Sequence, residues 1–217
     1  ALAARAACLS SSVTVVASTG TPIDRVEAVA HAKRYLDLAH AVGAPCVRLF
    51  CGSIPATMTR LDAIALAADS LRQIGDYAQP RGVIAVLETH DAFIRTDQLM
   101  ELVRATGHPA VQVLWDIHHP WRVAGESLDF SVTQLDGHIA ATHVKDSLPT
   151  GDGDTYRYTL TGQGDVPLQA ALHALKSRGY TGYLTLEWEK RWIPDLPPPE
   201  VAFPQYAAQM RTWLGEV

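Results

Sequence analysis

The sequence has few cysteines and no long apolar run. Its 217 residues include three cysteines, Cys8, Cys46 and Cys51, and no two of them have a C-x-x-C spacing. An odd count without that spacing argues against a disulfide framework or a thiolate zinc site, and it favours a reducing compartment such as the cytoplasm. No apolar stretch approaches the roughly 18 residues of a membrane helix, and the opening lacks the features of a signal peptide. We therefore expect a cytoplasmic protein with no membrane partner.

Positive charge is also scarce. The chain has 18 Lys and Arg against 23 Asp and Glu, a formal net charge of −5. Binding to nucleic-acid phosphates relies on clustered Lys and Arg, so we expect no nucleic-acid partner. Hydrophobic residues make up 47% of the chain, which is enough to build a sizeable core. We predict a single domain over residues 1–217 that acts on a small molecule.

Four short apolar stretches each end on a residue type that binds metal ions. The four end residues are Glu88, Asp116, His143 and Glu187. The first three are 28 and 27 residues apart, which matches a strand-helix-strand repeat of about 30 residues. If the strands lie parallel, their C-terminal ends share one face of the sheet, and the four side chains converge there. Three carboxylates and one imidazole predict a site for one divalent cation.

Strand-like and helix-like segments alternate along the chain. Two further strands are expected at residues 12–17 and 45–50, and helices at residues 21–42, 58–78, 96–107, 128–135, 166–177 and 204–214. Alternation predicts a parallel sheet with helices outside, an α/β fold of the (β/α)8 TIM-barrel type. Six strands and a helix-like opening lead us to expect that about two N-terminal strands are lacking. Residues 148–165 are expected to form a long loop, and the proline-rich residues 194–204 an irregular segment.

Short motifs around the strand ends resemble a known family. They are Leu87-Glu88-x-His90, Asp116-x-x-His119-Pro120, His143-Val144-Lys145-Asp146, Gly162-x-Gly164 and Leu186-Glu187-Trp188-Glu189. Together they resemble the xylose isomerase-like TIM-barrel superfamily, and within it the sugar phosphate isomerase/epimerase branch that includes ketose 3-epimerases and inosose dehydratases. The resemblance covers about residues 24–189, and its motifs are specific to the superfamily rather than to a substrate.

The resemblance implies a metal cofactor and a set of substrate contacts. One Mn²⁺, Mg²⁺ or Co²⁺ ion, with Zn²⁺ as a further option, would be held by the residues matching Glu88, Asp116, His143 and Glu187. His119 would contact substrate, although the residues alone do not separate it from His118. Glu189 is a weaker alternative ligand. The residues expected to bind substrate are His119, Lys145, Asp146, His90, Arg48 and Trp121.

The activity implied is that of an isomerase or epimerase acting on a sugar or sugar phosphate through an enediolate intermediate. Glu88 and Glu187 would serve as ligands and as the catalytic pair that moves the proton. Loss of a β-hydroxyl instead of proton return would give a lyase, an inosose- or dehydroshikimate-type dehydratase. An abasic-site endonuclease needs several more histidine ligands, and a non-catalytic sugar-binding barrel is the remaining alternative. The expected partner is a carbohydrate or polyol, and a homo-oligomer is compatible with the sequence.

Overall fold

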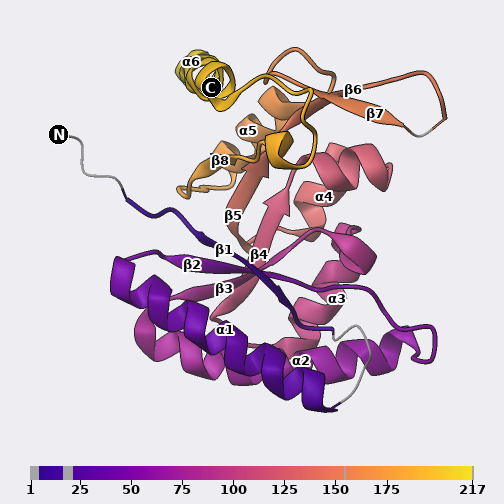
Figure 1. The fold of residues 1–217 in the computed structure, drawn as a ribbon, viewed down its shortest axis with the longest axis vertical. Coiled ribbons are helices and arrows are strands. Elements are labelled where there is room, and N and C mark those ends of the chain that lie inside the picture. The colour runs from indigo at the N-terminus through magenta and orange to yellow at the C-terminus, as the bar shows by residue number, and fades with distance from the viewer. Residues whose placement is uncertain (1–4, 17–21, 154, 217) are drawn as a thin grey trace.

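The computed structural model describes residues 5–16, 22–153 and 155–216. A parallel sheet in the order β1-β2-β3-β4-β5-β8 forms the inner layer. Figure 1 shows this sheet curling, with helices on its outer side. The predicted fold class is therefore confirmed, with the expected six strands in the curled sheet. They are β1 (Leu9–Thr14), β2 (Cys46–Phe50), β3 (Ile84–Glu88), β4 (Val111–Asp116), β5 (Ile139–Val144) and β8 (Leu184–Leu186).

The helices follow the strands as the alternating pattern predicts. They are α1 (Pro22–Val42), α2 (Arg60–Ala78), α3 (Thr96–Thr106), α4 (Leu128–Gln134), α5 (Leu168–Ser177) and α6 (Pro199–Glu216). Thr59 caps α2, because its side chain accepts a hydrogen bond from the Asp62 N–H at 3.1 Å. Gly107 ends α3 with a φ of 60°, a left-handed conformation that favours glycine. Within the described ranges no helix is long and apolar enough to cross a membrane.

Alternation along the strands separates the core into two parts. Leu87, Val113 and Val144 belong to the large cluster between the sheet and the helices. Residues of the opposite parity, Val86 and Leu114 among them, form a small cluster inside the curled sheet. Glu88 and Asp116 lie two residues beyond Val86 and Leu114, so they share this inner side. The inner side at the C-terminal strand ends therefore carries polar groups instead of core residues.

Three predicted elements differ from the structure. The first strand is Leu9–Thr14, with a bulge between Ser10 and Thr14, and its pairing continues past Thr14 because Val15 N–H donates to Phe50 O at 3.0 Å. Ala17, the end of the predicted strand, lies outside the described residues. The predicted loop at 148–165 overlaps an antiparallel hairpin, β6 (Asp146–Pro149) with β7 (Tyr156–Thr159). The predicted irregular segment ends early because α6 begins at Pro199, where a helix needs no N–H donor.

Candidate metal site

Glu88, Asp116, His143 and Glu187 converge at the C-terminal end of the sheet. Each offers one ligand atom, and these atoms all lie within 4.8 Å of one another. Glu88 ends β3, Asp116 ends β4 and His143 is in β5, while Glu187 directly follows β8. Glu88 and Asp116 are fully buried. The predicted convergence is therefore present, and metal binding by this four-residue cluster stays a prediction.

His143 links two of the carboxylates. Its Nδ1 lies 3.1 Å from Glu88 Oε1 and 3.3 Å from Glu187 Oε1. Burial alone would lower the pKa of His143, but hydrogen bonds to Glu187 and Glu88 outweigh it and raise this pKa to about 10. The Nδ1 hydrogen of His143 therefore lies close to both Glu88 Oε1 and Glu187 Oε1. A metal ion needs a deprotonated imidazole, so binding at this place would release that proton.

Two further cations compensate the carboxylates. Arg48 Nη1 lies 3.1 Å from Glu88 Oε2 and 3.4 Å from Glu187 Oε1. Lys145 Nζ lies 2.8 Å from Asp116 Oδ2 and 2.5 Å from Glu187 Oε2, and its side chain is only 1% exposed. Both cations contact candidate ligands directly, while the substrate contacts expected of them stay a prediction. Arg48, Lys145 and protonated His143 together carry three positive charges, which equal the three negative charges of Glu88, Asp116 and Glu187.

The same contacts keep Glu187 ionised. Burial alone would raise the pKa of Glu187, but the hydrogen bond from His143 and the charge of Lys145 outweigh it and hold this pKa well below its usual range. Its side chain is 22% exposed, against 1% for Glu88. Glu187 is therefore the more accessible of these two glutamates, and it is in its ionised form.

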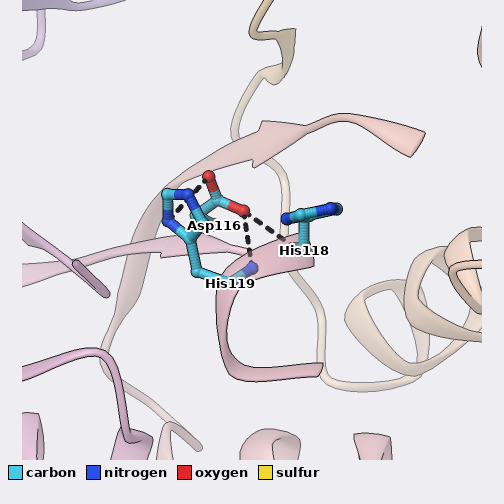
Figure 2. A group of neighbouring side chains, drawn as sticks. All are labelled: Asp116, His118 and His119. Carbon is cyan, nitrogen blue, oxygen red and sulfur yellow. Dashed lines mark hydrogen bonds and ion pairs between the residues drawn. The ribbon is translucent and has the colours of Figure 1, made fainter. Parts of the chain in front are cut away.

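Asp116 is oriented by the turn that follows β4. Its Oδ1 accepts the backbone N–H groups of His118 at 2.8 Å and His119 at 3.1 Å. Figure 2 shows the carboxylate between the two histidine rings. Oδ2 lies 2.8 Å from Lys145 Nζ and 3.2 Å from His119 Nδ1, but it has no partner in hydrogen-bonding geometry. A buried carboxylate oxygen in this position fits coordination to a cation.

The two histidines after Asp116 differ in their surroundings. His119 Nδ1 lies 3.1 Å from the Thr89 carbonyl, which can only accept, so Nδ1 carries a hydrogen and Nε2 is an acceptor. His118 Nε2 lies 2.9 Å from Ser147 Oγ, and burial lowers the pKa of His118 to about 3. Asp116, His118 and His119 form a second group that could hold a metal ion. The sequence had left the two histidines undistinguished.

A cavity of about 780 Å³ adjoins the cluster. His119 and Glu189 line it. His119 Nδ1 lies 3.2 Å from Asp116 Oδ2, and Glu189 Oε1 lies 3.6 Å from Lys145 Nζ. The predicted His90 also lines this cavity. Tyr156 and Tyr158 line it too, although sequence reasoning missed both. The alternating Tyr156-Arg157-Tyr158-Thr159 pattern is the strand signal that could have found them.

Two predicted substrate residues lie elsewhere. Trp121 lines a different pocket, together with Arg122 and Asp165. Asp146 Oδ2 accepts the backbone N–H groups of Gly162 at 2.8 Å and Gly164 at 2.9 Å. Asp146 therefore anchors the base of the β6–β7 hairpin. This contact also explains the Gly-x-Gly motif, because a Cβ on Gly164 would clash with that carboxylate.

Comparison with known proteins identifies the family. The family model described as "Xylose isomerase-like TIM barrel" matches residues 4–214, so the chain belongs to this family and the predicted resemblance is confirmed. The solved structure of the "IOLI protein with a binding zinc atom" is similar, with a TM-score of 0.80 and 20% identity over 98% of this chain and 77% of that chain. No curated protein sequence matches significantly.

Two further solved structures share the fold. L-ribulose 3-epimerase has a TM-score of 0.77 and 17% identity, covering 96% of this chain and 75% of that chain. The probable 3-DHS dehydratase AsbF from Bacillus anthracis has a TM-score of 0.70 and 17% identity, covering 88% and 73%. Both similarities cover most of this chain, so the shared fold is not limited to the residues around the cluster.

Proposed function

We propose that this protein is a divalent-metal-dependent isomerase or epimerase of a small sugar. One observation carries the proposal: three carboxylates and an imidazole meet within 4.8 Å beside a cavity of about 780 Å³. The donor set suits Mn²⁺, Mg²⁺ or Co²⁺, with Zn²⁺ as a further option. Solved structures of the same fold include an epimerase and a zinc-bound protein, which supports this choice.

The bound ion would supply Lewis-acid stabilisation to a hydroxy-carbonyl substrate. Glu187 is the proton acceptor in this proposal, because it is ionised and the more accessible of the two glutamates. Glu88 begins the cycle protonated and gives its proton to the other face of the substrate carbon, after which solvent takes the proton from Glu187 and restores the one on Glu88. Arg48 contacts both carboxylates and fixes their spacing. An enediolate forms on the substrate between the two proton transfers.

His119 is assigned to the substrate. Its Nδ1–H points to the Thr89 carbonyl, which leaves Nε2 as an acceptor on the wall of the cavity. Burial lowers the pKa of His119, so the ring is neutral near pH 7. A neutral imidazole nitrogen can accept a hydrogen bond from a sugar hydroxyl. His119 would therefore orient the substrate without adding charge.

Solvent-deuterium incorporation tests this mechanism. The purified protein, loaded with Mn²⁺, is incubated in deuterated water with free ketoses, sugar phosphates and inososes. Turnover with deuterium at the carbon beside the carbonyl is the expected result, because the removed proton exchanges with solvent. Turnover without deuterium would contradict the two-glutamate mechanism and indicate hydride transfer.

Dehydration is the second outcome of the same proton removal. It is favoured by the similarity in fold to the probable 3-DHS dehydratase. In that case Glu187 still removes the proton, and Glu88 gives its proton to the β-hydroxyl, which leaves as water, instead of to the carbon. Product analysis by mass separates the two reactions, because only the dehydration product has lost one water.

A further inference from the structure

The cavity beside the cluster is larger than a single sugar ring requires. Pockets of about 300–1,000 Å³ bury drug-sized ligands, and this cavity measures about 780 Å³. The four candidate ligands are not among its lining residues; His119, which contacts Asp116, and Glu189, which contacts Lys145, connect it to the cluster. The remaining lining comes from the segment after β8, from the β6–β7 hairpin and from His90.

The segment after β8 contributes three apolar or aromatic side chains to the lining. They are Trp192, Ile193 and Leu196. The Trp192 side chain is 71% exposed, which is high for so large an apolar residue. The apolar face of a ring can stack on an indole, and an exposed tryptophan beside a sugar-sized site offers such a surface.

The segment that carries Trp192 is held in place by its own side chains. Trp188 Nε1 donates to the Pro197 carbonyl at 2.9 Å. Lys190 Nζ donates to the Leu196 carbonyl at 2.7 Å and also to the Pro194 carbonyl. The Arg191 guanidinium lies 5.0 Å from the centre of the Trp192 ring. The tryptophan surface is therefore organised before any ligand binds, which lowers the entropy cost of binding.

The facing wall is the β6–β7 hairpin. Tyr156 and Tyr158 project from it, with ring centres 5.4 Å apart, and both rings pack near His118 at 4.9 and 5.3 Å. Asp146 anchors the base of the hairpin, and Arg122 Nη2 donates to the Ser147 carbonyl at 3.2 Å. Two anchored walls thus face the same cavity.

The charged residues of the cavity disfavour an anionic ligand. Glu189 and Asp195 contribute two carboxylates, whereas Arg157 contributes one guanidinium. A phosphate group in this region would meet a net negative lining. An uncharged ring fits both the charge and the apolar surface.

We propose that Trp192, Ile193, Leu196 and Tyr156 form an outer subsite, which binds an uncharged second ring attached to the far end of the substrate sugar. The proposal rests on the proposed function, since it places the carbonyl end of that sugar at the four-residue cluster. The shared chemistry is a ring with an apolar face, supplied either by a second sugar or by an aromatic group. The preferred substrate is accordingly a substituted sugar rather than a free monosaccharide.

Binding and turnover of three matched compounds test the outer subsite. They are a ketohexose, the same ketohexose with a glucosyl group on O6, and the same ketohexose with a benzyl group on O6. Affinities are measured calorimetrically with the Mn²⁺-loaded protein, and turnover is measured separately. We expect at least one substituted sugar to bind about tenfold more tightly than the ketohexose, the size of a stacking interaction of about 1.4 kcal/mol. The better of the two identifies the second ring as sugar or aromatic.

Trp192→Ala should remove this preference and leave turnover of the free ketohexose unchanged. Phe203→Ala is the control, because Phe203 is also an exposed aromatic residue but belongs to α6. Equal affinities for all three compounds, or equal losses for all three in Trp192→Ala, would overturn the outer subsite. Tight, Trp192-dependent binding without turnover would support the subsite and contradict the proposed function. Turnover of all three compounds that is unchanged in Trp192→Ala would support the proposed function and contradict the outer subsite.

Discussion

Replacing Lys145 with methionine should weaken the protein without metal and strengthen its binding of metal. Lys145 is 1% exposed and contacts Asp116 and Glu187 at 2.8 and 2.5 Å. Methionine has a similar length but no charge, so two carboxylates lose their nearest cation in a buried place. Breaking a buried ion pair costs about 3–5 kcal/mol. We expect the lower end, because Arg48 and His143 still contact Glu187.

The stability that the metal-free Lys145→Met variant loses should appear as a gain in its free energy of metal binding. A divalent ion restores the missing positive charge, so the loss of stability is largely absent in the metal-bound state. By linkage, a ligand that binds only the folded state gains the affinity that the metal-free state loses in stability. A difference of about 3 kcal/mol corresponds to a melting temperature lower by about 6–12 °C for a chain of this size. It also corresponds to Mn²⁺ binding that is about 10²-fold tighter.

Calorimetry of Mn²⁺ binding and thermal unfolding with and without Mn²⁺ provide the assay. Lys176→Met is the control, because Lys176 is exposed on α5 and should change neither quantity. Unchanged metal affinity and unchanged stability in Lys145→Met, together with weaker substrate binding, would refute this reasoning. That result would return Lys145 to the substrate role that the sequence predicts.

Two further predictions concern the catalytic pair and the hairpin. Glu187→Gln keeps the size of the side chain but removes its charge, so turnover should fall at least ~10²-fold. Glu189→Gln should have far less effect on turnover in the same assay, and equal losses would contradict the assignment of Glu187. Gly164→Ala should lower the free energy of unfolding by about 1–3 kcal/mol, because the new Cβ would clash with the Asp146 carboxylate and the Ser147 carbonyl. Gly215→Ala, which meets nothing within 4 Å, is the control in chemical denaturation.

The sequence predicts the cluster because its signals are local. Each strand is a short apolar run, and the residue at its end follows directly from the run. Glu88 and Asp116 share the parity of the inner residues Val86 and Leu114, so parallel pairing alone brings them together. The fold class follows from the same alternation of strands and helices.

The sequence does not predict contacts made across the fold. Lys145 meets Glu187, which is 42 residues away in the sequence, only because β5 pairs with β8. The β6–β7 hairpin was missed because its surroundings are rich in Gly, Asp and Thr, the composition of a loop. Its stability depends on Asp146 binding the backbone of Gly162 and Gly164, a contact that composition does not reveal.

Metal stoichiometry tests the central claim most directly, because two overlapping groups of side chains could hold an ion. His143 belongs to the four-residue cluster, and His118 belongs only to the second group with Asp116 and His119. Both histidines are buried, so their alanine variants form a matched pair. Mn²⁺ bound per chain is measured by elemental analysis after equilibrium dialysis. We predict one ion per chain in the unmodified protein and in His118→Ala, and none in His143→Ala at the same free Mn²⁺ concentration. Retention of the ion in His143→Ala with loss in His118→Ala, or no bound ion in the unmodified protein, would contradict the account.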